Sequence, residues 1–200
     1  MVNFIISEHV KEEMSEIGTD IALFKHRIDP TLSSSIIKQA EAFDFKTSKT
    51  FHQGSGALND HRTSSTFWIS GSVEMNDLDQ QLVPIFTKGT SDLQVHSAEI
   101  GSYIETLKID NDEGYSLNRY EAGQEYKEHS DDGPEAHRAV SLILYLNDDY
   151  EGGELHFRRQ NVTIKPEAGD LLLFPSCYTH PHQALPVKSG IKYSIVTWCR

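Results

Sequence analysis

The stretch Ala139-Val-Ser-Leu-Ile-Leu-Tyr-Leu146 predicts a buried β-strand, because it is a nearly continuous apolar run that is rich in branched and aromatic residues. It belongs to a series of short β-rich runs that begins at Tyr115, with Gly, Pro, Asp and Asn residues between them. Many short strands at close spacing favour a sandwich or jelly roll over a parallel sheet with crossover helices. The other predicted strands are residues 116–120, 154–157, 161–164, 170–174, 182–185 and 193–199.

The sequence before Tyr115 is mixed. Asp29-Pro30 precedes apolar residues at helical spacing and predicts a helix over about 31–43. A second helical pattern runs from Leu93 to Leu107, with a break near Gly101, and residues 64–69 predict a strand. Residues 7–18 are polar and charged and indicate a short surface helix or a loosely held arm. We therefore expect an α+β fold, with a jelly-roll core over about 115–200 braced by N-terminal helices.

Composition narrows the class of protein. A chain of 200 residues is long enough for one domain with a sizeable core, so we expect a single domain over 1–200, with residues 1–22 as a possible arm. The net charge of −12 argues against binding nucleic acid through its phosphates. Two cysteines, no basic leader at the start and no apolar segment near the roughly 18 residues of a membrane span predict a cytoplasmic protein without a membrane anchor.

The segment His129-Ser-Asp131 places an imidazole and a carboxylate on one face of an extended strand, where the two side chains can hold one metal ion. A third ligand must come from elsewhere, and His180 and His182 are the candidates near a later predicted strand. Two histidines and one carboxylate with open positions form the facial arrangement of non-haem Fe(II) oxygenases. The alternative is a surface turn, because Asp132-Gly133-Pro134 follows directly.

A possible anion site accompanies these ligands. Lys192 lies in an otherwise apolar stretch, and a buried lysine is costly unless it meets an anion, although a lysine facing water on an edge strand is an alternative. Ser141 and Tyr145 share one face of the strand 139–146 by period two, so their hydroxyls are expected to point at the same partner. A core tyrosine with a satisfied hydroxyl is the alternative for Tyr145.

The order of these residues resembles the prolyl 4-hydroxylase family of Fe(II)- and 2-oxoglutarate-dependent dioxygenases. The resemblance covers residues 120–198, with a weaker upstream similarity at Arg62-Thr-Ser-Ser65. The matching positions are Tyr120-Glu-Ala-Gly123, Tyr126, His129-Ser-Asp131, Arg138, Ser141-Leu-Ile-Leu-Tyr-Leu-Asn147, Gly152-Gly-Glu-Leu155, Phe157, Pro166-Glu-Ala-Gly-Asp170, Phe174-Pro-Ser176, His182, Pro186-Val187, Gly190 and Lys192.

Carried over by position, the resemblance assigns a role to each candidate. It implies that His129, Asp131 and His182 hold the iron, with His182 preferred to His180 because the distal histidine of the family stands ten residues before the basic residue. It implies that Lys192 and Tyr145 hold the far carboxylate of 2-oxoglutarate and that Tyr120 lies near the cosubstrate. Tyr126 and Arg138 are expected to line the pocket for a peptide, although an ion pair with a nearby acid is an equal alternative for Arg138.

The resemblance also implies the chemistry: hydroxylation of a C–H bond with O2, coupled to decarboxylation of 2-oxoglutarate to succinate and CO2, with ascorbate as a reductant. With a lysine at position 192, the sequence resembles the members that act on prolyl residues, which implies a prolyl residue in a peptide or protein as the substrate. Residues 54–61 and the arm are expected to close over it. The alternatives are a hydroxylase of a free amino acid or small metabolite, and a non-catalytic jelly roll that binds a metal such as zinc.

Overall fold

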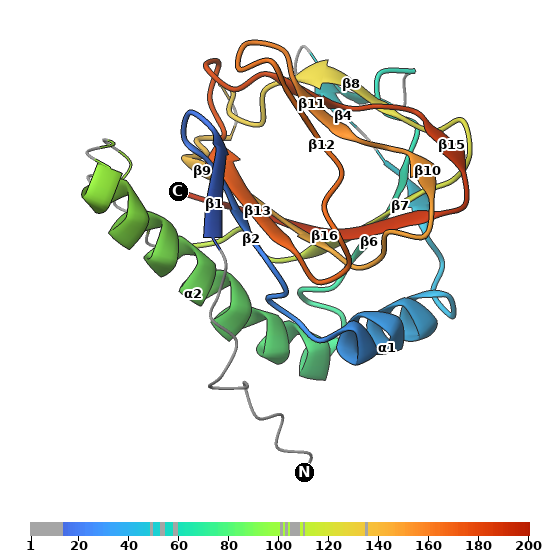
Figure 1. Ribbon diagram of the computed structural model, residues 1–200. Helices are drawn as coiled ribbons and strands as arrows, with labels where there is room; N and C mark the ends of the chain where they lie inside the picture. The colour runs from blue at the N-terminus through green and yellow to red at the C-terminus, as the bar shows by residue number, and fades with distance from the viewer. Residues whose placement is uncertain are drawn as a thin grey trace.

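A computed structural model describes residues 14–48, 50–52, 55–57, 60–100, 102, 104, 109, 111–134 and 136–200. Two sheets lie face to face and two helices lie outside the larger one (Figure 1). The larger sheet has eight strands in the order β1-β2-β13-β9-β16-β7-β6-β3, and the smaller has four in the order β12-β11-β14-β8. The chain is therefore a sheet-rich sandwich with few helices.

Strand bounds follow the predicted series closely after residue 115. The large sheet contains β1 (Met14–Gly18), β2 (Ile21–Phe24), β3 (Lys46–Thr47), β6 (Ser65–Trp68), β7 (Ser116–Tyr120), β9 (Val140–Tyr145), β13 (Leu171–Pro175) and β16 (Lys192–Cys199). The small sheet contains β8 (Tyr126–His129), β11 (Leu155–Phe157), β12 (Val162–Ile164) and β14 (His182–Ala184). Two short pairs complete the set: β4 (Thr50–His52) with β5 (Ser55–Ala57), and β10 (Glu151–Gly152) with β15 (Val187–Ser189).

The central strands of the large sheet are buried on both faces. Leu171 and Leu173 face a core cluster that includes residues of both helices, whereas Leu172 and Phe174 face a second cluster between the two sheets. Successive side chains of a strand point to opposite faces, so burial on both sides favours apolar residues at every position. This explains why the sequence here is a continuous apolar run rather than an alternating one.

Both helices differ in extent from the prediction. Helix α1 covers Pro30–Ala40, three residues shorter than expected at its end, with Asp29 accepting a hydrogen bond from the Thr31 N–H as the N-cap. Beyond it, Phe43 packs on Phe67 with ring centroids 4.8 Å apart. Helix α2 covers Asn76–Ile100, so the pattern read from Leu93 is only its last two turns. The remainder of that predicted helix falls largely outside the described residues.

The N-terminal prediction is partly wrong. Residues 14–18 form β1, which pairs with β2 through a two-residue turn, and β2 pairs with β13 at the edge of the large sheet. A helix or loose arm is therefore excluded for residues 14–22, because backbone hydrogen bonds to a buried strand hold this segment. Residues 1–13, the first part of the expected arm, lie outside the described residues, as do residues 54, 58 and 59 of the expected closing loop over 54–61.

Within the described residues, no helix combines the length and the apolar character that crossing a bilayer requires.

Candidate functional site

One pocket lies between the two sheets and brings most of the predicted site residues together. The large sheet contributes Asn118, Tyr120, Ile143, Tyr145, Lys192, Ser194, Val196 and Trp198, while the small sheet and nearby segments contribute Arg62, Tyr126, His129, Asp131, Leu155, His182 and Ala184. Lys192, Ser194, Val196 and Trp198 alternate along β16, so period-two geometry points all four into the pocket.

Strand pairing places the two predicted histidine ligands opposite each other. His182 of β14 is the direct cross-strand partner of His129 of β8, and their ring centroids are 4.4 Å apart. Asp131 follows β8, and its N–H and that of Asp132 both donate to the Ser176 carbonyl oxygen, which fixes the loop. The Asp131 carboxylate then lies between the two imidazoles, 3.4 Å from His129 Nε2 and 3.5 Å from His182 Nε2.

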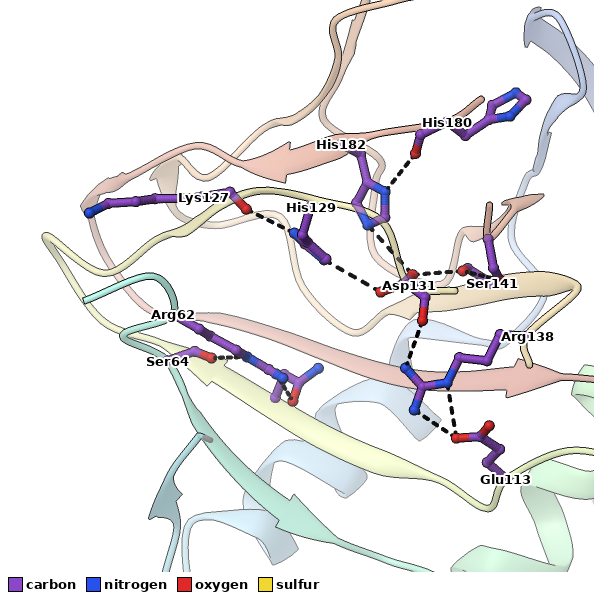
Figure 2. A network of polar contacts seen from close by, with 12 residues as sticks. Arg62, Ser64, Glu113, Lys127, His129, Asp131, Arg138, Ser141, His180 and His182 are labelled. Carbon is purple, nitrogen blue, oxygen red and sulfur yellow. Dashed lines mark hydrogen bonds and ion pairs between the residues drawn. The ribbon is translucent and has the colours of Figure 1, made fainter. Parts of the chain in front are cut away.

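Backbone carbonyls orient both imidazoles. His129 Nδ1 lies 2.8 Å from the Lys127 carbonyl oxygen, and His182 Nδ1 lies 3.0 Å from that of His180 (Figure 2). A carbonyl can only accept, so each Nδ1 carries the hydrogen and each Nε2 presents a lone pair toward Asp131. This tautomer, fixed by a backbone partner, is the usual state of a histidine that ligates a metal.

Protonation states also suit a cation. Burial, together with His129, lowers the pKa of His182 to about 4, so its imidazole is neutral at pH 7. Burial by itself would raise the pKa of Asp131, but His182, His129 and the Ser141 hydroxyl outweigh it and hold the pKa well below its ordinary value. The two imidazoles and one carboxylate, with ligand atoms that all lie within 4.8 Å of one another, fit a divalent metal.

The structure separates His180 from His182. Figure 2 shows the His180 ring turned away from Asp131. Its Nε2 is 2.9 Å from the Thr19 carbonyl oxygen and its Nδ1 is 2.9 Å from Thr179 Oγ1, so both ring nitrogens already have partners. His182 is therefore the histidine that faces the predicted metal position.

Lys192 forms the opposite end of the pocket. Its side chain is buried, and its Nζ donates to the Gly153 carbonyl oxygen at 2.7 Å. Gly153 has φ +67, and a Cβ there would lie 3.0 Å from the Tyr150 ring, so glycine is required to present this carbonyl. Among the described residues no carboxylate lies within ion-pair distance of Lys192. Burial lowers its pKa to about 8.

Tyrosines surround this ammonium group. Lys192 Nζ lies 5.2 Å from the ring centroid of Tyr145 and 5.5 Å from that of Tyr120. The Tyr145 hydroxyl is buried and has no hydrogen-bond partner among the described residues, and burial raises its pKa well above the usual value, so it stays protonated as a donor. A buried cation beside an unpartnered hydroxyl donor is a site for an anion.

Two predicted assignments need correction. Ser141 does share a face with Tyr145, but residues four apart on a strand are about 13 Å apart, so the two hydroxyls do not meet one partner. The Ser141 hydroxyl donates instead to Asp131 Oδ2 at 2.6 Å and contacts Ser176 Oγ at 2.7 Å. It therefore supports the carboxylate at the metal position rather than the anion site.

Arg138 does not line the pocket. Its Nε and Nη2 donate to Glu113 Oε2 at 3.0 and 2.7 Å, and its guanidinium lies 3.6 Å from the Trp198 ring. An ion pair with a nearby acid was the alternative expected for Arg138 from the sequence, and this is the contact that forms. Arg138 lies behind Trp198, whose side chain does reach the pocket.

Tyr126 and Arg62 form a stack with the first histidine. The Tyr126 ring lies parallel to His129, with centroids 3.5 Å apart, and the Arg62 guanidinium lies 4.9 Å from the Tyr126 centroid. Arg62 donates to Ser64 Oγ at 2.9 Å and to Asn118 Oδ1 at 2.8 Å. The sequence analysis assigned no role to Arg62. The one indication that this residue belongs to the site was the similarity of residues 62–65 to the prolyl 4-hydroxylase family.

Comparison with known proteins agrees with this geometry. Residues 115–200 match the family model described as the 2OG-Fe(II) oxygenase superfamily. A putative prolyl 4-hydroxylase of Acanthamoeba polyphaga mimivirus is 28% identical over 185 residues, covering 82% of this chain and 69% of the relative. Probable prolyl 4-hydroxylase 9 of Arabidopsis thaliana is 33% identical over 117 residues, covering 44% of this chain; the chain thus spans 41% of the length of that relative.

Solved structures share the fold. A prolyl hydroxylase from Trichoplax adhaerens, solved in complex with a hypoxia-inducible factor peptide fragment, has a TM-score of 0.71 at 20% identity, covering 90% of this chain and 83% of the other. The viral collagen prolyl hydroxylase of Paramecium bursaria Chlorella virus-1 has a TM-score of 0.64 at 23% identity, covering 90% and 96%. The chain is therefore similar to the 2OG-Fe(II) oxygenase superfamily over residues 115–200 and to prolyl hydroxylases over most of its length.

Proposed function

We propose that this chain is an Fe(II)- and 2-oxoglutarate-dependent dioxygenase that hydroxylates a prolyl residue in a peptide or protein. One observation carries the proposal: a single pocket holds a two-histidine, one-carboxylate cluster at one end and, at the other, a buried lysine ammonium that has no ion-pair partner among the described residues. A metal and a dicarboxylate that binds it match these two ends. The balanced reaction is R–H + O2 + 2-oxoglutarate → R–OH + succinate + CO2.

In this proposal His129, Asp131 and His182 hold Fe(II). Bound together, Fe(II) and 2-oxoglutarate supply oxygen activation and oxidative decarboxylation, and ascorbate is the reductant typical of prolyl hydroxylases. The protein supplies ligands of fixed tautomer and an ionised carboxylate, which Ser141 keeps in place. No acid-base pair is needed, so the other acids of this chain are assigned no catalytic role.

The far carboxylate of 2-oxoglutarate is proposed to bind Lys192 and the Tyr145 hydroxyl, with Tyr120 as the neighbouring wall. These groups fit it because, within the part of the chain that the structure describes, the buried ammonium makes one hydrogen bond and the buried hydroxyl makes none. Burial also removes the water that would otherwise compete with the carboxylate, which strengthens a charge-assisted hydrogen bond.

The peptide is proposed to contact the wall formed by Tyr126, Arg62 and Trp198. These three side chains line the pocket at or near His129 and Asp131, so a prolyl ring lying against them would be close to the metal. Arg138 would act indirectly, because its contact with Trp198 and its ion pair with Glu113 hold that indole in position. We also infer that the two-sheet sandwich is the double-stranded β-helix of this superfamily, with α1 and α2 bracing the large sheet.

The decisive experiment supplies the protein with Fe(II), 2-oxoglutarate, ascorbate and a set of proline-containing peptides. We expect peptide-stimulated succinate formation and a peptide that gains one oxygen atom, located to proline by tandem mass spectrometry. Matched peptides with alanine in place of proline serve as the control and should give neither product. Stimulation by free proline or by small metabolites alone would reject the peptidyl assignment while leaving the chemistry intact.

Binding of 2-oxoglutarate distinguishes the proposed enzyme from the alternative, a metal-binding jelly roll without catalytic activity. Addition of 2-oxoglutarate to the Fe(II) protein without oxygen should produce a weak visible charge-transfer band that Asp131→Ala abolishes. A protein that binds zinc tightly, shows no such band and forms no succinate would instead be a metal-binding module. Tight, salt-dependent binding to DNA or RNA would favour a nucleic acid substrate, against the expectation from the net charge of −12.

A further inference from the structure

His180 is buried, lies two residues before a proposed ligand, and has no part in the function above. Its side chain is 3% exposed. Because the Thr19 carbonyl oxygen can only accept, His180 Nε2 must carry the hydrogen in the 2.9 Å contact with it. His180 Nδ1 is then an acceptor, and the Thr179 hydroxyl, at 2.9 Å, is its donor. The ring is therefore held in one tautomer and one orientation.

The main chain of the same residue orients the metal ligand. The His180 carbonyl oxygen accepts from His182 Nδ1 at 3.0 Å, and this bond leaves His182 Nε2 directed at Asp131. A shift of the His180 backbone would therefore rotate or release the His182 imidazole. One residue thus connects Thr19, 161 positions away in sequence, with the metal position.

The partner of His180 belongs to a well-anchored element. The N-terminal hairpin, defined as residues 14–24, turns at Thr19 and Asp20, and its second strand pairs with β13. The Ser102 hydroxyl donates to Asp20 Oδ1 at 2.5 Å. At Gly18 a Cβ would lie 2.9 Å from Val162 Cγ2, so glycine lets the hairpin pack closely against β12 of the small sheet. The Thr19 carbonyl is therefore a fixed reference point.

We propose that His180 is a positioning residue through which the N-terminal hairpin sets the orientation of His182 toward the metal. The inference rests on the proposed metal site but adds an element that lies outside residues 115–200, the part of the chain that matches the family model. Outer partners that orient ligands commonly change metal affinity by about 10- to 100-fold. Linkage makes the effect reciprocal: metal binding must stabilise the hairpin contact.

The test uses Mn(II) alone as the probe, with free Mn(II) measured by electron paramagnetic resonance. We expect His180→Phe, which keeps an aromatic ring, although a larger one, but removes both ring hydrogen bonds, to weaken Mn(II) binding about 10-fold. His180→Gln, which retains a donor and an acceptor, should recover most of the affinity. Thr179→Val, which removes only the donor to Nδ1, should give a smaller loss and provides a second variant should His180→Phe fold poorly.

A matched control lies on the neighbouring strand. His156 Nδ1 contacts Thr163 Oγ1 at 2.8 Å, a similar histidine–threonine bond on β11 and β12 that has no contact with a proposed ligand. His156→Phe should leave Mn(II) affinity unchanged. Hydrogen exchange adds a readout independent of affinity: Mn(II) should slow exchange of the amides of residues 14–24 in the wild type, and this protection should disappear in His180→Phe.

The outcomes separate the two proposals. Wild-type protein that binds Mn(II), with unchanged affinity in folded His180→Phe and Thr179→Val, would overturn the role of His180 and leave the proposed function standing. An equal loss in His156→Phe would show a general effect on the small sheet and would also overturn it. Wild-type protein that does not bind Mn(II) would reject the metal site itself and, with it, this inference.

Discussion

The two ends of the pocket differ in how far the protein has satisfied its own polar groups. At the proposed metal end, formed by His129, Asp131 and His182, both histidine Nδ1 atoms and the carboxylate have protein hydrogen bonds. At the proposed cosubstrate end, formed by Lys192 and Tyr145, the ammonium makes one hydrogen bond to a carbonyl and the hydroxyl makes none among the described residues. The metal end is pre-organised for its ligand, whereas the cosubstrate end retains unsatisfied donors that binding would satisfy.

This difference predicts opposite effects on the empty protein. Removing a group at the metal end breaks existing contacts and should cost stability as well as function. Removing a group at the cosubstrate end relieves an unsatisfied buried polar group, so the empty protein should lose little stability or gain some. Substitutions at His129, Asp131 or His182 should therefore reduce both function and stability, whereas substitutions at Lys192 or Tyr145 should reduce function without a matching loss of stability.

The largest effect is expected for Asp131→Ala. It removes one of three ligands and leaves the Ser141 hydroxyl without its acceptor, so Fe(II) affinity should fall by more than the roughly 100-fold upper value for outer partners, with no measurable succinate formation. Metal titration and turnover assays measure both. The control is Asp148→Ala, because Asp148 is exposed and lies outside the pocket. Retained turnover in Asp131→Ala would show that Asp131 is not a metal ligand.

The next largest effect is expected for Lys192→Met, which keeps an unbranched side chain of nearly the same length but removes its charge. Loss of a charge-assisted contact worth roughly 1.5–3 kcal/mol should weaken 2-oxoglutarate binding by about 10- to 150-fold, measured calorimetrically with Mn(II) in place of iron. Lys192→Arg, which keeps the charge, should lose less. Equal cosubstrate affinity in Lys192→Met and the wild type would show that the anion binds elsewhere.

The thermal stability of Lys192→Met without ligand tests the second part of the comparison, that removing a group at this end does not destabilise the empty protein. The pKa of Lys192 falls from 10.5 to about 8 on folding, so below pH 8 the folded protein carries the full cost of the buried charge. Between pH 8 and 10.5 the unfolded chain binds a proton that the folded protein does not, and this cost disappears as pH rises. Ligand-free Lys192→Met should therefore melt at a higher temperature than wild type at pH 7, and the gap should narrow toward pH 10.

The smallest effect is expected for Tyr145→Phe. A hydrogen bond from this uncharged hydroxyl to a carboxylate, worth about 1.5 kcal/mol, predicts roughly 10-fold weaker 2-oxoglutarate binding, with unchanged or slightly higher stability of the empty protein because no existing bond is lost. Tyr115→Phe is the matched control: the Tyr115 hydroxyl donates to Asp112 at 2.8 Å, so this variant should lose about 1 kcal/mol of stability and keep its cosubstrate affinity. The opposite pattern in the two melting curves would contradict the comparison.

The sequence by itself determined much of the C-terminal half. Strands β7, β9, β11, β12, β13, β14 and β16 follow from short β-rich runs between turn residues, and two of the most buried, β9 and β13, are almost continuously apolar. The set His129, Asp131, His182 and Lys192 was assigned through the resemblance to the prolyl 4-hydroxylase family, since the residues alone left His180 and His182 as alternatives. The strands could be predicted because strand periodicity depends only on residues that are close together in the sequence.

Only the tertiary structure decided the remaining features. Periodicity did not reveal β1, because its side chains are partly exposed and its stability comes from pairing with β2 and the buried sheet edge. Ser141 was assigned to the wrong end, because strand period gives the face but not the partner 10 residues away across a loop. The positions of three further side chains depend on long-range contacts: Arg138 pairs with Glu113, Arg62 lies against Tyr126, and His180 contacts the Thr19 carbonyl. Such long-range contacts depend on how the sheets pack, which no local pattern encodes.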